Sequence, residues 1–506
     1  MRKQLPAPCL GLVLALCLAG TQAGAAVFDV RAYGATGDGR TLDTAAINKA
    51  IDAAHAAGGG TVQFPAGTYL SGSIHLQSNI ALYLDHGATI EATADPEAYD
   101  PPEPNAWDMY QDFGHSHWHN SLIWGEGLEN VSILGPGLIH GKGLTREGGQ
   151  RVGNKTIALK LCRNVIIRDV SILMAGHFGI LASGVDNLTI DNLKIDTNRD
   201  GINIDACRHV RISNCSINSP WDDAIVLKSS YGLGFARATE NVTITNCEVS
   251  GYDRGTFLNG TYQRNEPKSP DRGGVTGRIK LGTESNGGFR NITISNIVFE
   301  RCRGLALETV DGGLLEDVAI ANITMRDIVS APIFLRLGSR MRGPAGTPVG
   351  KLRRVSISNL IVYNADPRYG SIISGIPGHP IEDVKLRDIR IYYQGGGTRE
   401  QAALEPPENE GSYPDPEMFG VIPAYGFFIR HVRGIELSDV EVSYMQEDLR
   451  PPFLLNDVAS VEFNHVKAQR ARNVPMFVLR NVEDFSVHQS RPLPDKQLKS
   501  VKRRDL

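Results

Sequence analysis

The segment Arg163-Asn164-Val165-Ile166-Ile167 recurs 23 residues later as Asp186-Asn187-Leu188-Thr189-Ile190, and after a further 22 residues as Arg208-His209-Val210-Arg211-Ile212. Apolar and polar side chains alternate in each copy, which is typical of a short strand with one buried face. Further copies are headed by Val131, Val242, Ile292, Val318, Val355, Val384, Ile435 and Val461. A strand that recurs at this interval indicates a solenoid, in which each coil repeats the coil before it.

The corners of the coils are also visible in the sequence. Several copies end in Asn, a residue that tolerates the left-handed backbone of a tight turn: Asn192, Asn214, Asn246, Asn296, Asn322 and Asn359. The spacing is too short and uneven for a β-propeller, whose blades need about 40 residues. We therefore predict an all-β fold, a parallel β-helix with one internal column of apolar side chains. The column contains Val131, Val165, Leu188, Val210, Val242, Ile292 and Val318.

Three segments are expected along the chain. Residues 1–25 have the charged start, apolar run and small-residue cleavage site of a secretory signal peptide, which predicts a secreted or periplasmic protein. Residues 26–490 form the β-helix, with a helix at 43–57 that begins at Asp43 and caps the open end of the solenoid. Residues 491–506 form a basic tail that we expect to be disordered.

Composition excludes several classes of function. The net charge is −4, and it becomes −6 without residues 1–25, so the overall field does not favour nucleic acid. No later segment is apolar enough to span a membrane. The five remaining cysteines are widely spaced, which indicates neither a disulfide framework nor a zinc site. We expect a monomer without nucleic-acid or membrane partners.

Three carboxylates precede neighbouring strands of the repeat. Asp200 follows Asn198-Arg199, and Asp222-Asp223 follow Trp221 one coil later. Because coils stack about 4.8 Å apart, residues one coil apart become neighbours on one face. Clustered carboxylates raise the pKa of at least one member, and glycoside hydrolysis needs one protonated and one ionised carboxyl group. The alternatives are a Ca²⁺ site and Asp residues that only cap turns.

These motifs resemble glycoside hydrolase family 28, which contains polygalacturonases and rhamnogalacturonases that degrade pectin. The resemblance extends over nearly all of the chain after residue 25, including Phe28-Asp29-Val30 and the stretch 60–69. Asn198-Arg199-Asp200 matches the family's Asn-Thr-Asp, and Trp221-Asp222-Asp223 matches its Gly-Asp-Asp. The resemblance implies a single-stranded right-handed parallel β-helix of the pectate lyase type and inverting hydrolysis without a cofactor. Asp222 would be the general acid, and Asp200 with Asp223 would activate water.

Two further family motifs are altered. The position of the histidine in the family's Gly-His-Gly falls near Gly277, so the histidine is absent here. Arg254 and Arg278 are both candidates to replace it. The family's Arg-Ile-Lys, which binds a galacturonate carboxylate, falls on Ala306 and Glu308. A literal Arg278-Ile279-Lys280 lies one coil earlier, where Lys280 should still face the substrate.

Asp200, Asp222 and Asp223 are the catalytic candidates. The substrate-binding candidates are Asn198, His177, Lys228, Arg254, Arg278, Lys280, Glu308 and Arg336. We expect no metal site, and we interpret His115, His117 and His119 around Trp118 as an aromatic loop that contacts substrate.

The substrate and mode of action follow from the altered motifs. A carboxylate at Glu308 would repel galacturonate, which favours a neutral rhamnose there and hence the rhamnogalacturonan branch of the family. Insertions at 101–120, 229–238 and 260–277 could close one end of the substrate site and favour exo action. The leading hypothesis is a hydrolase of α-galacturonosyl bonds in pectic polysaccharide. The alternatives are a Ca²⁺-dependent pectate-type lyase and a non-catalytic carbohydrate-binding β-helix.

Overall fold

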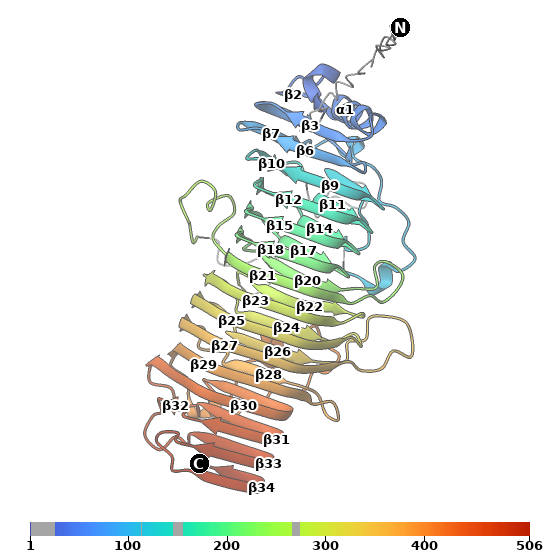
Figure 1. Ribbon diagram of the computed structural model, residues 1–506. Coiled ribbons are helices and arrows are strands. Elements are labelled where there is room, and N and C mark those ends of the chain that lie inside the picture. Colours follow the sequence, from blue (N-terminus) through green and yellow to red (C-terminus); the bar gives the residue numbers. More distant parts are fainter. Residues whose placement is uncertain (2–25, 113, 145–154, 266–273) are drawn as a thin grey trace.

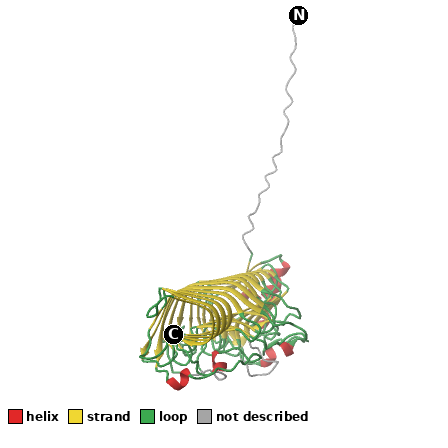
Figure 2. Cartoon of the chain, turned by 90° about the horizontal axis from the view of Figure 1, so that it is seen from below, coloured by secondary structure: helices red, strands yellow, loops and turns green. Residues whose placement is uncertain are grey.

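The chain folds into one long right-handed parallel β-helix, as predicted (Figure 1). The computed structural model describes residue 1 and residues 26–112, 114–144, 155–265 and 274–506. Within these residues, every strand pairing along the solenoid is parallel except the last one, between β33 (Phe477–His488) and β34 (Lys496–Asp505). Figure 2 shows loops and short helices gathered along one flank of the strand stack.

Three sheets run along the axis. The first sheet, which positions the site, consists of β5 (Ile74–His75), β8 (Ile123–Glu126), β11 (Lys155–Lys160), β14 (Phe178–Ser183), β17 (Asp200–Asp205), β20 (Ile225–Ser229), β22 (Ile279–Ser285), β24 (Leu305–Thr309), β26 (Ile333–Leu337) and β28 (Ser371–Ser374). The second consists of β1 (Val27–Asp29), β3 (Gly60–Phe64), β6 (Ile80–Leu84), β9 (Glu129–Leu134), β12 (Arg163–Arg168), β15 (Asp186–Asp191) and β18 (Arg208–Ser213). The third consists of β2 (Asp38–Leu42), β4 (Gly67–Ser71), β7 (Ala88–Ala92), β10 (Leu138–His140), β13 (Ser171–Leu173), β16 (Lys194–Asp196), β19 (Ser216–Asn218) and β32 (Lys467–Ala468).

In the C-terminal half, successive strands of one coil merge into longer ones. Strands of the second and third sheets are continuous in β21 (Thr239–Ser250), β23 (Phe289–Glu300), β25 (Leu314–Ile328), β27 (Lys351–Ala365) and β29 (Ile381–Gly395). Strand β30 (Phe427–Gln446) runs through all three sheets, and β31 (Phe453–Asn464) and β33 run through the first two. The only α-helices in the described chain are α1 (Thr44–Ala56) and the short α2 (Arg399–Ala402).

The predicted apolar column is confirmed. Parallel pairing aligns its members one coil apart through seven consecutive strands of the second sheet, and each is buried. The column continues beyond Val318 through Val355, Val384, Ile435, Val461 and Phe485. A single interior therefore extends along the solenoid, and each coil buries its apolar face only against its neighbours.

The Asn corners adopt the left-handed conformation that the sequence predicts. The φ angle is 56° at Asn214, 54° at Asn246 and 57° at Asn296. The side-chain amides also form a ladder along the axis, because Asn246 donates to Asn214 at 3.3 Å, Asn296 to Asn246 at 3.0 Å and Asn322 to Asn296 at 2.9 Å. Asparagine thus serves each corner in two ways: it tolerates the left-handed backbone, and its side chain hydrogen bonds to the next coil.

The N-terminal end of the solenoid is capped by α1, as predicted. Its buried face consists of Ile47, Ala50, Ile51 and Ala54. Asp43 precedes the helix, but its carboxylate does not cap the helix. It accepts hydrogen bonds from the backbone N–H groups of Thr36 and Gly37 at 2.7 and 3.1 Å instead.

The expectation of a disordered C-terminal tail was wrong. Residues 496–505 form β34, which pairs antiparallel with β33 and buries Val501. The reason is that the last coil leaves an unpaired strand edge, and β34 satisfies its backbone hydrogen bonds. The remaining cysteines, Cys162, Cys207, Cys215, Cys247 and Cys302, are buried free thiols within the described chain. The predicted signal peptide lies outside the described residues, apart from Met1, and no described helix has the length and apolar character to span a membrane.

The Asn ladder leads to a stability prediction. Asn296→Ala removes two ladder hydrogen bonds and leaves a residue that tolerates the left-handed backbone less well than asparagine, which costs about 1–2 kcal/mol. We expect the urea unfolding midpoint to fall accordingly. Asn296→Gly keeps the backbone relaxed and should lose less. Equal losses in the two variants would contradict a conformational role for Asn296.

Candidate active site

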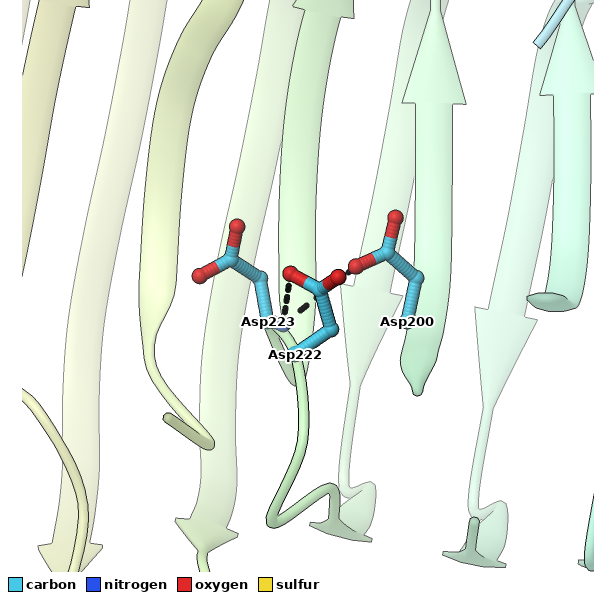
Figure 3. Close-up of side chains that lie close together, drawn as sticks. All are labelled: Asp200, Asp222 and Asp223. Atoms are coloured by element: carbon cyan, nitrogen blue, oxygen red, sulfur yellow. Dashed lines mark hydrogen bonds between the residues drawn. The ribbon is translucent and has the colours of Figure 1, made fainter. Parts of the chain in front are cut away.

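The structure brings the three predicted carboxylates together. Asp200 begins β17, and Asp222 and Asp223 lie in the turn before β20 (Figure 3). One oxygen from each carboxylate lies within 4.8 Å of the others. The backbone N–H of Asp223 donates to Asp200 at 3.3 Å and to Asp222 at 3.1 Å. Because Ile202 pairs with Ile225, the residue in register with Asp200 is Asp223, and not Asp222 as the spacing of 22 residues suggested.

Two of the three carboxylates have a buried guanidinium partner. Arg199 Nη2 lies 2.7 Å from Asp222 Oδ2, and Arg278 Nε lies 2.8 Å from Asp223 Oδ1. Lys280 Nζ lies 3.8 Å from Asp223. These cations offset part of the cost of burying carboxylates that are only 3–8% exposed.

Asp200 has a different environment. Its hydrogen-bond donors are the neutral amide of Asn203, at 3.1 Å, and the Asp223 backbone. Burial raises the pKa of Asp200 well above its ordinary value, the charges of Asp222 and Asp223 add to this effect, and Lys228 and Arg199 oppose it. The resting site therefore favours the protonated form of Asp200.

Lys228 belongs to a buried chain of charges beside Asp200. Its Nζ contacts Glu284 at 2.7 Å, Glu284 contacts Arg340 at 3.6 Å, and Arg340 pairs with Asp311 at 2.6 Å. Although burial alone would raise the pKa of Glu284, Lys228 and Arg340 hold that pKa well below its ordinary value. Lys228 was predicted to bind substrate, but its ammonium is committed to Glu284.

The expectation that Glu308 faces a substrate sugar was wrong. Glu308 is fully buried on β24, with Lys280 Nζ at 3.4 Å and Arg278 at 3.9 Å. Lys280 also donates to Thr283 at 2.8 Å and to the hydroxyl of Tyr413 at 3.1 Å. Lys280 of β22 and Arg278, which directly precedes that strand, neutralise Glu308, so it presents no uncompensated charge that would repel galacturonate.

Arg336 was also predicted to bind substrate, and its contacts assign it a structural role. It is 1% exposed, and its guanidinium donates to Ser374, Gly375 and the backbone carbonyls of Glu408 and Asn409 at 2.8–3.3 Å. These bonds fasten the 404–411 loop to the first sheet. No donor geometry remains for a sugar carboxylate.

His177 lies one coil before Asp200, as its position in the sequence suggested. Its ring stacks on Phe178 with centroids 4.1 Å apart and faces His115 at 6.0 Å. His115 is buried, and burial together with Lys228 lowers its pKa to about 3, so it is neutral. The rings of His115, His177 and Phe178 pack together, and Phe178 is the strand partner of Asp200.

Trp118, in the loop at 101–120, is not accessible as an aromatic platform for a sugar. Trp118 is fully buried against the first sheet and donates to Ser183 at 3.0 Å. His117 contacts Asp108 at 3.0 Å, whereas His119 contacts Glu126 at 3.0 Å. The three histidines of the loop therefore have separate partners, and the only metal-competent cluster in the described chain is the Asp trio.

The two candidates for the missing histidine differ in position. Arg278 is the residue that contacts Asp223, so it lies where the histidine slot was predicted, next to Gly277. Arg254 instead stacks on the indole of Trp221, 3.6 Å from the ring centroid. The Trp221 backbone donates to Asn198 at 3.1 Å, which links this stacked pair to the turn before Asp200.

Several residues around the carboxylates were missed by sequence reasoning. Tyr413 and Asp415 come from the 404–426 loop, more than 130 residues after Lys280, and Asp415 also pairs with the buried Arg303. No local pattern signals these contacts. Arg199 was visible as a departure from the family motif, but its pairing with Asp222 depends on stacking between coils.

Comparison with known proteins agrees with this geometry. A model described as "Right handed beta helix region" matches residues 147–269, and one described as "Rhamnogalacturonase A/epimerase, pectate lyase-like" matches residues 27–98. A probable polygalacturonase of Vitis vinifera is 24% identical over 71% of this chain and 73% of its own length. A polygalacturonase of Gossypium hirsutum is 26% identical over 77% and 89%. The resemblance to glycoside hydrolase family 28 is confirmed.

The family 28 resemblance extends to solved structures. The family 28 exopolygalacturonase of Yersinia enterocolitica superposes with a TM-score of 0.65 over 87% of this chain and 79% of its own length. At 18% identity, that likeness establishes the shared fold alone. The β-helix therefore carries the family motifs, and Arg199, Trp221 and Arg278 are the positions near the carboxylates where this sequence differs from those motifs.

The charge state of Asp200 leads to a prediction about stability and pH. The pKa of Asp200 is raised on folding, so the folded protein binds this proton more tightly than the unfolded chain does. The ionised group therefore destabilises the fold increasingly as pH rises through that pKa. We expect Asp200→Asn to unfold at a higher temperature than the unmodified protein at pH 8. The gain should shrink as pH falls toward about 4, the ordinary aspartate range.

Asp52→Asn, on the exposed face of α1, is the matched control for this measurement. It removes one carboxylate without a buried environment, so its unfolding temperature should follow that of the unmodified protein across the same pH range. A pH-independent difference between Asp200→Asn and the unmodified protein would show that Asp200 is not the proton-holding group.

Proposed function

We propose that this chain is a secreted glycoside hydrolase that cleaves α-galacturonosyl bonds in pectic polysaccharide. The polygalacturonase relatives support a pectin-degrading hydrolase. The observation that carries the proposal is the pair of charge environments in the Asp cluster. Asp200 favours the protonated form, whereas Asp222 and Asp223 each contact a guanidinium group. Glycoside hydrolysis requires this division between an acid and a base.

The reaction needs a proton on the departing glycosidic oxygen and a water deprotonated as it attacks the anomeric carbon. The family resemblance assigns the first role to Asp222. In this chain, however, Arg199 replaces the family's Thr and favours the ionised form of Asp222. The local electrostatics therefore favour an exchange of roles, with Asp200 as the acid and Asp222 or Asp223 holding the water.

Enclosure of the site supports action on a chain end. The three carboxylates are only 3–8% exposed. The 101–120 loop joins the loop after β26 through the Asp112–Arg342 ion pair at 2.5 Å, and the 404–426 loop places Tyr413 on the opposite side. A long polysaccharide cannot pass through such a site, whereas a terminal residue can enter it. We propose exo action on this basis.

The substrate at the scissile bond is proposed to be a terminal galacturonate. The argument for a neighbouring rhamnose rested on an uncompensated Glu308, and Lys280 and Arg278 neutralise that carboxylate. Homogalacturonan ends therefore become the preferred substrates. A Ca²⁺-dependent lyase is the second candidate because the three carboxylates approach closely enough to hold a cation. Arg199 and Arg278 disfavour a lyase, because they already pair with the carboxylates whose negative charge a divalent ion would need.

The first functional prediction concerns the acid. Asp200→Asn and Asp222→Asn should each lower kcat on digalacturonate by at least about 10²-fold, the range for loss of an acid or base. On 4-nitrophenyl α-galacturonide, whose leaving group needs no protonation, the variant that lacks the acid should keep most of its activity. We expect that variant to be Asp200→Asn. Retention by Asp222→Asn instead would restore the family assignment, and near-normal turnover of digalacturonate by both variants would disprove the hydrolase proposal.

The second functional prediction concerns products. In inverting enzymes the two catalytic carboxyl groups are usually about 6.5–9.5 Å apart. The closest oxygens of the three carboxylates lie nearer to one another than this, within 4.8 Å. The stereochemistry of the product is therefore the direct test of inversion. Proton NMR should show the β anomer of galacturonate first, and mono-galacturonate should form while the viscosity of polygalacturonate stays high. Unsaturated products that absorb ultraviolet light and vanish with a chelator would identify a lyase.

A further inference from the structure

The C-terminal part of the solenoid contains a hollow whose lining is strongly basic. Its volume is about 920 Å³, and it lies at the turn 469–476 between β32 and β33. Four cationic side chains contribute to its lining: Lys467, Arg470, Arg472 and Arg491. We refer to it as the basic hollow. Its turn occupies the same position in its coil as the turns that precede Asp200 and Asp222.

The cations of the basic hollow outnumber its acidic residues by four to one. Within the described chain, no ion pair joins any of the four to a carboxylate. The single acidic residue in the lining, Glu441, pairs with Arg390 at 3.5 Å and is also the strand partner of Lys467 on the adjacent coil. Lys467 and Arg491 are bridge partners in adjacent coils, so two of the charges are held side by side. Four cations near one carboxylate, which Arg390 shares, leave an excess of positive charge that is unfavourable, and an anionic ligand would offset that cost.

The surroundings reinforce this polarity. Residues 467–506 contain ten Lys and Arg against four Asp and Glu, whereas the whole chain has a net charge of −4. Strand β34 forms the end marked C in Figure 1 and adds exposed basic side chains there: Lys499, Lys502, Arg503 and Arg504. The C-terminal end is therefore positive on an otherwise acidic protein, and such a field attracts polyanions.

We propose that the basic hollow is a second, non-catalytic site that binds a polyuronate chain through its carboxylates. It lies seven strand spacings from the β20 rung, roughly 34 Å at ~4.8 Å per rung. Arginine forks bind carboxylates in two-point contacts, so Arg470, Arg472 and Arg491 suit the repeated carboxylates of a uronate chain. The site would hold the polymer while one of its ends is processed elsewhere. The choice of polygalacturonate as ligand rests on the proposed function, whereas the hollow itself does not.

The test measures binding separately from hydrolysis. In an Asp222→Asn background, which prevents turnover, we expect Arg470→Glu/Arg472→Glu to weaken polygalacturonate binding about ten-fold or more at about 50 mM salt. The difference should shrink in high salt. With Asp222 intact, the same double substitution should leave hydrolysis of digalacturonate unchanged and raise KM for the polymer. The unfolding midpoint checks that both proteins are folded.

Lys194→Glu/Lys351→Glu is the matched control, because both lysines are exposed on other coils and the change in net charge is identical. An equal loss of binding in this control would overturn the proposal, since net charge alone would then explain it. Fully methyl-esterified polygalacturonate should bind weakly to every variant. Dextran sulfate that binds as tightly as polygalacturonate would also overturn the proposal. Absence of digalacturonate hydrolysis would refute the proposed function while the binding comparison remained informative.

Discussion

The in-register stacking of coils is the constraint on which the rest of this structure depends. Each second-sheet strand hydrogen bonds to the strand one coil away, and the column from Val131 to Phe485 fixes that register because a one-residue shift would expose every apolar side chain. Left-handed corners at Asn246 and Asn296 keep the turns superimposable from coil to coil. Insertions are therefore confined to the turns, where loops can grow without disturbing the stack.

Register also determines how the site manages charge. Residues that project from consecutive first-sheet strands are about 4.8 Å apart, so a buried charge on one rung needs a partner on the next. Asp222 pairs with Arg199 from the previous turn, Asp223 with Arg278 from the following one, and Glu308 with Lys280 across one rung. A substitution at one rung consequently changes the charge state of its neighbours.

The repeat and the Asp cluster could be predicted because both depend on spacing between coils, which the sequence displays directly. The roles of Glu308 and Arg336 could not be predicted. Strand alternation correctly placed both outside the core, but the 404–426 loop covers that face with Tyr413 and with the carbonyls that Arg336 binds. A loop that folds back over 70 to 130 residues leaves no periodic signal. Residues 491–506 were misjudged for a related reason, since their charge suggested disorder while the open edge of β33 supplied a pairing partner.

Charge balance explains why the proton belongs in the Asp cluster. Lys228 with Glu284, Lys280 with Glu308, Arg340 with Asp311 and Arg303 with Asp415 are each neutral pairs. Within the Asp cluster itself, three carboxylates contact two guanidinium groups, Arg199 and Arg278, which leaves one negative charge that a proton on Asp200 cancels. A uronate that enters this enclosed site brings a further negative charge. Because nearby negative charge raises carboxyl pKa values, we infer that an acidic substrate strengthens the site's hold on the proton that its own cleavage requires.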